Sequence, residues 1–199
     1  MTPLLLEGIT FDGTETMVGV FGCTLLSPSS KESLLSQSQS LADDMEVIVQ
    51  LVDAKRIASP AHLFFATLHA LQAFHYGFQR AKTQGMEILR YAAAQRQISR
   101  ALDVLGITHS TSQVGGVVID GSQGLLRRFY AKLLREIGGK DTPQVLEISD
   151  SEKAKAVKSA FNISASEVET VLTSKDQIGR FDAIAKLVCE RCALLAIEK

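Results

Sequence analysis

The first part of the chain has the hydrophobic pattern of β-strands. Residues 4–10 and 16–24 are rich in apolar and β-branched side chains, and Asp12-Gly13 lies between them. Asp-Gly between two such runs favours a tight turn, so we predict a β-hairpin. Residues 46–52, EVIVQLV, predict a further strand.

Residues 27–44, SPSSKESLLSQSQSLADD, lie between these strands and are polar and rich in serine. This composition predicts a flexible loop or insertion with at most a short helical turn. We assign no chemistry to this segment, and its role stays open.

A helical pattern follows. Ser59-Pro60 is typical of a helix start, with Ser as the N-cap and Pro at the first helical position. The helix is expected to run to about Arg80. Its expected buried stripe consists of Phe64, Leu68, Leu71 and Phe78.

The central stretch, residues 85–106, contains the polar triplet Gln95-Arg96-Gln97 between two apolar helical runs. Three adjacent helical residues cover about 200° of the circumference, so a half-buried helix would bury part of the triplet. If the helix breaks near Ala93-Ala94, the triplet begins a new helix instead. The alternative is one continuous helix with an exposed polar patch, and the spacing leaves both open.

The rest of the chain mixes strands and helices without regular β-α-β alternation, and Gly115-Gly116 predicts a strand that another chain segment approaches closely. This mixture predicts a single α+β domain over residues 1–199, with a mixed, mainly antiparallel sheet and several helices on one side. The expected strands are 115–120, 145–148 and 193–197; the expected helices are 123–137, Asp150 or Ser151 to Phe161, one from Ser164 or Ser166, and 181–188.

The formal net charge of −1 excludes bulk electrostatic attraction to duplex nucleic acid or a membrane. The charge is uneven, however, because residues 80–140 carry 10 Lys and Arg against 4 Asp and Glu. This excess indicates either a local anion-binding surface or ordinary solvated helix faces. No apolar window is long enough for a membrane span, and the N-terminus does not resemble a signal peptide, so a cytoplasmic location is expected.

Candidate catalytic chemistry is sparse. Cys189 and Cys192 have the spacing of a redox or zinc motif, but no second pair completes four ligands, and Cys23 lies far away in the sequence. No two of His62, His69 and His75 are four residues apart, the usual spacing of paired ligands on one helix. We therefore expect no metal, no cofactor and no enzymatic activity; a small metal-dependent enzyme using Cys189 and Cys192 is the less favoured alternative.

The triplet has the chemistry of an anion and base contact. At a helix N-terminus, free N–H groups and the helix dipole favour an anion, and Arg96 adds a planar fork for phosphate. The amides of Gln95 and Gln97 could contact a base edge or a sugar hydroxyl. Arg90 and Arg100 add nearby charge, and Tyr91 is either a stacking ring or a core residue.

The stretch MEIL…QRQISRALDVLGI, residues 86–107, resembles the smallest core subunit of the KEOPS complex, the archaeal-type PRPK-binding-protein family. Further landmarks agree in order: residues 58–63 (ASPAHL), 145–148 (VLEI), 161–163 (FNI) and 190–195 (ERCALL).

The resemblance implies a non-catalytic subunit that binds the kinase-like ATPase subunit of KEOPS, and other KEOPS subunits indirectly. It also implies a contact with the single-stranded 3′ CCA end of tRNA, in a complex that attaches threonylcarbamoyl to the adenosine beside the anticodon. The family's segment near the RNA end corresponds to Gln95-Arg96-Gln97-Ile98, although the family often has Gly where this chain has Ala94. The residues that bind the kinase are not assigned, and a purely structural kinase-docking subunit without RNA contact is the remaining alternative.

Overall fold

The computed structural model describes residues 4–27, 30–174 and 176–197. Its centre is a five-stranded sheet in the order β1-β2-β4-β3, with the short β5 pairing with the remaining length of β2. Every pairing described is antiparallel. The strands are β1 (Leu5–Phe11), β2 (Thr14–Leu25), β3 (Ile48–Asp53), β4 (Gln113–Ile119) and β5 (Gly139–Asp141).

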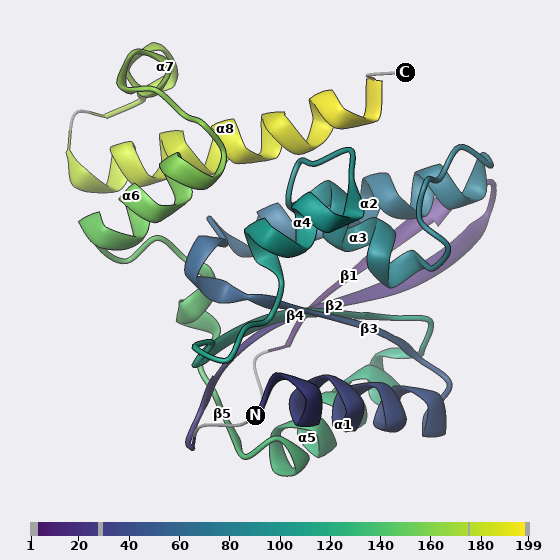
Figure 1. Ribbon diagram of the computed structural model, residues 1–199. Helices are drawn as coiled ribbons and strands as arrows, with labels where there is room; N and C mark the ends of the chain where they lie inside the picture. Colours follow the sequence, from purple (N-terminus) through teal and green to yellow (C-terminus); the bar gives the residue numbers. More distant parts are fainter. Residues whose placement is uncertain (1–3, 28–29, 175, 198–199) are drawn as a thin grey trace.

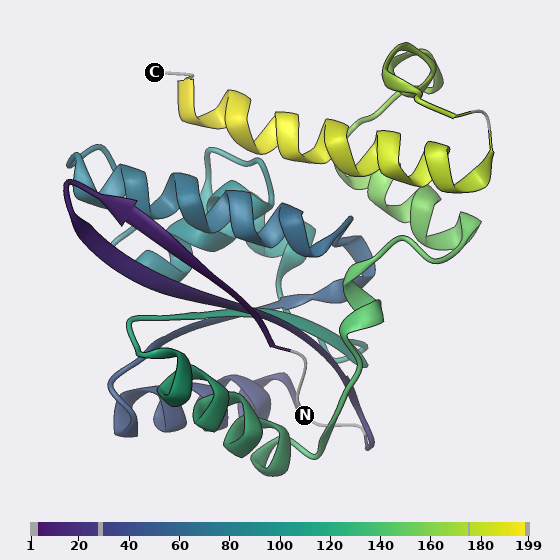
Figure 2. The same ribbon diagram turned by 180° about the vertical axis from the view of Figure 1, so that it is seen from behind.

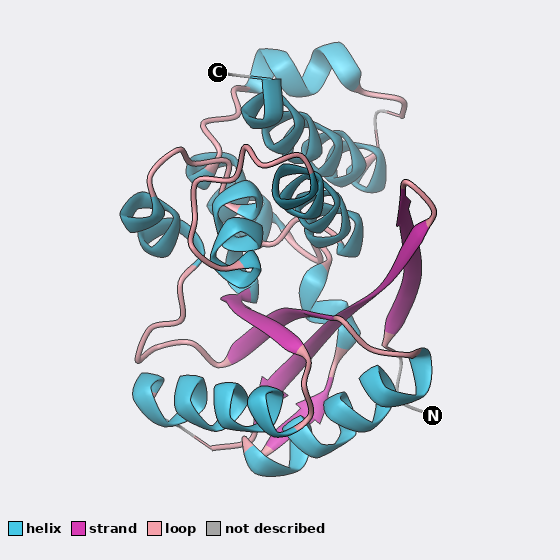
Figure 3. Ribbon diagram, turned by 90° about the vertical axis from the view of Figure 1, so that its right-hand side faces the viewer, coloured by secondary structure: helices cyan, strands magenta, loops and turns pink. Residues whose placement is uncertain are grey.

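Helices cover both faces of this sheet, so the expectation of helices on one side is wrong (Figures 1 and 3). On one face lie α2 (Pro60–His75), α3 (Gln84–Ala92) and α4 (Ile98–Leu105); on the other lie α1 (Lys31–Asp44) and α5 (Gln123–Glu136). The remaining helices are α6 (Ser151–Ala160), α7 (Ala165–Val171), α8 (Gln177–Ile197) and the 3₁₀ turns η1 (Ala54–Arg56) and η2 (Pro143–Leu146). No helix in the described part of the chain combines the length and apolarity that crossing a bilayer requires.

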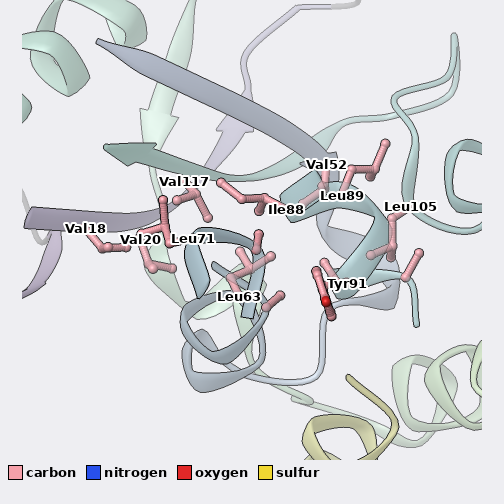
Figure 4. Packing of buried hydrophobic residues seen from close by; sticks show 14 of the residues in the cluster. Val18, Val20, Val52, Leu63, Leu71, Ile88, Leu89, Tyr91, Leu105 and Val117 are labelled. Atoms are coloured by element: carbon pink, nitrogen blue, oxygen red, sulfur yellow. The ribbon is translucent and has the colours of Figure 1, made fainter. Parts of the chain in front are cut away.

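The two-sided cover explains why β2 and β4 are apolar without a polar face. Val117 and Ile119 pack towards α2 and α3, whereas Val114 and Val118 pack towards α1 and α5. Alternate residues of one strand therefore enter different cores, as the period of two requires. Figure 4 shows the first of these cores, where side chains from the strands meet Leu63 and the residues of α3.

Two glycines let the strands and helices approach closely. A Cβ on Gly116 would lie 2.3 Å from the ring of Phe21, and one on Gly115 would lie 3.0 Å from Leu146. The predicted close approach at this Gly-Gly pair is confirmed.

A third apolar cluster joins α6, α7 and the first half of α8 beside the sheet (Figure 2). The second half of α8 continues across α2, where Leu195 enters the same core as α2 and α3. The predicted strand at 193–197 is therefore wrong. Buried Cys192 and Leu195 are three residues apart, which keeps both on one face of a continuing helix.

The serine-rich segment is also corrected. Residues 31–44 form α1, with Ser30 capping its first turn; residues 28–29 lie outside the described residues. Leu34, Leu41 and Ala42 are buried at helical spacing. The hydroxyl of Ser38 donates to the carbonyl of Leu35, which satisfies it within the helix.

Other boundaries differ from the predictions in smaller ways. The expected strand at 145–148 is η2, because its Val145 and Leu146 pack under the sheet without entering a ladder. The helix from Pro60 ends at His75, not near Arg80, and Phe78 is half-exposed rather than buried. The hairpin, the α+β class and the capping box at Ser164 are confirmed.

The contact between Gly116 and Phe21 yields a stability prediction. Gly116→Ala should lower the free energy of unfolding by about 2–3 kcal/mol, because the ring or the strand must move. Urea denaturation followed by far-UV circular dichroism measures this.

Gly124→Ala is the matched control, because nothing lies within 4 Å of its added Cβ at the start of α5. It should leave stability unchanged or raise it by up to about 1 kcal/mol. Equal effects at the two glycines would contradict the packing argument.

Candidate RNA-contact surface

The helix break expected before the triplet is present and has a defined geometry. Helix α3 ends at Ala92, and Ala94 adopts the left-handed conformation with φ of 49°. The N–H of Gln95 donates to the carbonyl of Arg90, and that of Ala94 donates to the carbonyl of Tyr91. These two bonds form a Schellman motif, which usually has glycine where this chain has Ala94.

The chain then reverses and starts α4, with Gln97 as its N-cap residue. An open hollow of about 320 Å³ lies at this reversal, and Leu195 from the end of α8 forms part of its wall. The other lining residues are Ala94, Gln95, Arg96, Gln97 and Arg100. The triplet, the start of α4 and the end of α8 thus meet at one place.

The predicted site residues separate into two groups. Arg96, Gln97 and Arg100 are exposed at the hollow, and Gln95 and Ile98 are half-buried beside it. We refer to residues 95–100 as the triplet surface. Sequence reasoning did not include Leu195, because only the fold brings α8 to this place.

Arg90 does not belong to the triplet surface, which corrects the prediction. Its guanidinium donates from Nε and Nη2 to the carboxylate of Glu87, at 3.1 and 2.5 Å, and both side chains are buried. The same carboxylate accepts from the backbone N–H groups of Arg80 and Ala81. Although burial alone would raise the pKa of Glu87, these bonds hold it below its usual value.

Tyr91 is a core residue, and the stacking alternative is wrong. Its ring is 1% exposed and packs in the core between the sheet and the helices. Its neighbour Arg90 places its guanidinium 4.5 Å from the ring centroid. Both residues therefore hold α3 in position instead of facing a ligand.

His62 connects the start of α2 to the end of α3. Its Nε2 lies 2.7 Å from the carbonyl oxygen of Ala92, and its Nδ1 accepts from the N–H of Ala58. The Ala92 carbonyl faces the end of its helix, where the histidine replaces the missing backbone donor. Phe161 packs edge-on against the imidazole. Burial lowers the pKa of His62 to about 4, so the ring is neutral near pH 7.

The other histidines and the cysteines lie apart. His75 pairs with Asp12 in the hairpin turn, and Cys189 and Cys192 lie on α8. Burial raises the pKa of Cys189 to about 11 and that of Cys192 further, which keeps both thiols protonated. Within the described ranges, no three His, Cys, Asp or Glu side chains gather as metal ligands would.

Comparison with known families bears on this arrangement. The model of a family described as kinase-binding protein CGI-121 matches residues 28–196, which is most of the chain. The chain belongs to the CGI-121 family. A comparison with curated proteins gives no match.

Membership in the CGI-121 family settles the class of protein. The family is the kinase-binding subunit of KEOPS, is non-catalytic, and takes part in the threonylcarbamoyl modification of tRNA. The matched range includes α1, so the serine-rich helix is part of the family domain and is not an insertion.

Ala94 gives a prediction on stability. Ala94→Gly should raise the free energy of unfolding by up to about 1 kcal/mol, because glycine adopts the left-handed conformation without the Cβ clash. Denaturant titration measures the change. The adjacent Ala93→Gly is the control; its φ of −80° suits alanine, so it should destabilise by about 0.5–1 kcal/mol.

His62 gives a prediction on pH dependence. The folded pKa of about 4 lies below the value of about 6.5 expected in the unfolded chain. Between these values the unfolded chain binds more protons, so stability should fall as the pH is lowered from about 6.5 to about 4. The contribution of His62 is on the order of 3 kcal/mol over this window.

Urea titrations at several pH values test this. His62→Gln should remove most of the slope and leave the smaller part from half-buried His69, whose pKa burial also lowers. His109→Gln, at an exposed position, should keep the full slope. Identical slopes in the two variants would exclude His62 as the source.

Proposed function

We propose that this KEOPS subunit holds the single-stranded 3′ CCA end of tRNA at the triplet surface while it is docked on the kinase-like ATPase subunit. The observation that carries the proposal is the chain reversal at Ala94, which brings the polar triplet and the start of α4 to one hollow. Catalytic chemistry then belongs to other subunits, in accord with the non-catalytic character of the family.

The charges at the triplet surface suit a phosphate. Arg96 and Arg100 are exposed there, and the first turn of α4 contains no acidic residue. The first N–H groups of a helix have no partner within the helix, and its dipole favours an anion at this end. A phosphate near the N-terminus of α4 would therefore meet backbone donors and a guanidinium together.

Amide groups at the same place suit an unpaired nucleotide. Gln95 and Gln97 each offer a donor and an acceptor, which matches base edges and ribose hydroxyls. Recognition of single-stranded RNA needs a few cations and exposed base edges, not a strongly basic protein. A net charge of −1 is compatible with this mode of binding.

The proposal predicts a loss of RNA affinity on charge reversal. Arg96→Glu should weaken tRNA binding about tenfold or more, since a charge-assisted bond becomes a repulsion. The salt dependence should also fall by a little under one logarithmic unit per phosphate lost. Fluorescence anisotropy with end-labelled tRNA at two or more salt concentrations measures both.

The controls separate end recognition from general binding. Removal of the CCA nucleotides should weaken binding to the unaltered protein and have little effect on Arg96→Glu. Lys155→Glu makes the corresponding charge reversal at an exposed position on α6 and should bind as the unaltered protein does. Equal affinity for tRNA with and without CCA would sink end recognition, and full kinase capture without any tRNA contribution would leave docking as the sole role.

A further inference from the structure

We infer that the end of α2 forms a second contact for single-stranded RNA, separate from the triplet surface. The segment concerned is residues 75–82, HYGFQRAK, which we call the aromatic turn. It lies beside the tip of the β1–β2 hairpin, at the opposite end of α3 from the triplet (Figure 1).

Aromatic rings follow one another through the aromatic turn and into the hairpin. Phe11 stacks on His75 with ring centroids 5.6 Å apart, and His75 meets Tyr76 edge-on at 4.7 Å. Tyr76 and Phe78 are nearly parallel, with an interplanar angle of 2° and centroids 6.3 Å apart. Tyr76 is 57% exposed and Phe78 is 50% exposed. Scattered exposed apolar residues are ordinary, but adjacent parallel rings form a flat stacking surface.

The backbone fixes this presentation. Gly77 has φ of 73°, and the N–H groups of Gly77 and Phe78 donate to the carbonyls of Phe74 and Ala73. This is a second Schellman motif, and it places Tyr76 and Phe78 on either side of the glycine. The two rings are therefore held by the helix end and not by a loose loop.

The buried ion pair of α3 orders the rest of the turn. The Glu87 carboxylate accepts from the backbone N–H groups of Arg80 and Ala81 and is held by Arg90. This leaves Arg80 and Lys82 exposed beside the rings, while the nearest acidic groups are occupied. Glu87 is buried, and Asp12 is bonded to His75. A few cations beside stacking rings are the usual components of a single-strand site.

A hollow of about 260 Å³ next to the rings supplies an independent observation. It is lined by Phe11, Thr14, Thr16, Leu71, Phe74, His75 and Gln84. The Oε1 atom of Gln84 is buried there and has no hydrogen-bond partner among the described residues. A buried acceptor without a donor is costly, so a ligand that donates at this point gains the missing bond.

These features favour a nucleobase over an apolar protein segment. A base is planar, stacks on rings, and in cytosine and adenine carries an exocyclic amine that can donate to the Gln84 oxygen. The hollow is smaller than the pockets of about 300–1,000 Å³ that take drug-sized ligands, in keeping with one base. The sites at the two ends of α3 are separated by roughly 12 Å of helix, a span that a few nucleotides of one strand can cover.

The chain offers a direct test of stacking because it contains no Trp. Tyr76→Trp places a single Trp in the aromatic turn of the full-length protein. Oligocytidylate of eight nucleotides should quench its fluorescence in a saturable manner, and Phe78→Ala in that background should weaken the binding about fivefold or more. Phe65→Trp is the matched control, an exposed aromatic position on α2 about three turns earlier, and it should show no quenching.

A second measurement tests the hollow. The unaltered Gln84 should favour oligocytidylate over oligouridylate about fivefold, because uracil carries a carbonyl in place of the amine. Gln84→Met, similar in size and without the amide, should bring the two affinities to within twofold of each other. An unaltered preference in Gln84→Met would overturn the assignment of this acceptor.

The outcome does not depend on the triplet surface. In the background of Arg96→Glu, quenching at Trp in position 76 should remain, which shows that the sites are separate. Absence of quenching, while Arg96→Glu still weakens tRNA binding, would overturn the inference about the aromatic turn and leave the proposed function intact. A change of fluorescence only on addition of the kinase-like subunit would also overturn it and identify a protein contact instead.

Discussion

The positioning of α3 depends on buried polar contacts at its two ends, and both candidate RNA contacts depend on that positioning. Near its start, Glu87 is bonded to Arg90 and to backbone N–H groups of the preceding turn. At its other end, the Ala92 carbonyl is bonded to His62 of α2. Removing one partner of such a buried contact leaves an unsatisfied group and costs more than the contact itself contributes. The chain directions on either side of α3 are therefore strongly determined.

These contacts explain why polar residues in an apolar stretch need not face a ligand. Arg90 lies between apolar neighbours that enter the core, and its carboxylate partner is three residues earlier on the same helix. A buried pair of this kind is weak evidence of stability, but it specifies which conformation the neighbouring loop adopts. The free N–H groups of Arg80 and Ala81 receive an acceptor, so the loop can leave its aromatic rings at the surface.

Local signals in the sequence were sufficient to predict where helices begin. Ser59, Asp150 and Ser164 each accept from the backbone of the first turn, as their positions before helical runs indicated. Helix ends were harder to predict, because Ala94 and Glu46 occupy left-handed positions that usually contain glycine. The break before the triplet was thus predicted from the polarity of the triplet, not from a terminating residue.

Residues whose role depends on tertiary contacts could not be placed from sequence. The serine-rich α1 has low intrinsic apolarity, and it is helical because Leu34 and Leu41 pack against the core under the sheet. Leu195 reaches the triplet surface only because α8 crosses the α2–α3 layer. Arg90 was assigned to the RNA from charge, yet its partner Glu87 was visible three residues earlier, the spacing at which side chains meet on a helix.

The near-neutral charge of the protein favours two modest RNA contacts over a single strong one. Neither the triplet surface nor the aromatic turn combines more than two exposed cations, so each should bind weakly and release its ligand readily. When one strand occupies both, the second contact forms at the high effective concentration set by the short span of α3. Affinity then depends on a strand long enough and flexible enough to reach both ends of the helix, which selects an unpaired RNA end over the duplex body of the same molecule. Docking on the kinase adds a further tether by the same principle, so a subunit with little RNA affinity of its own can still contribute substantially to RNA retention in the assembled complex.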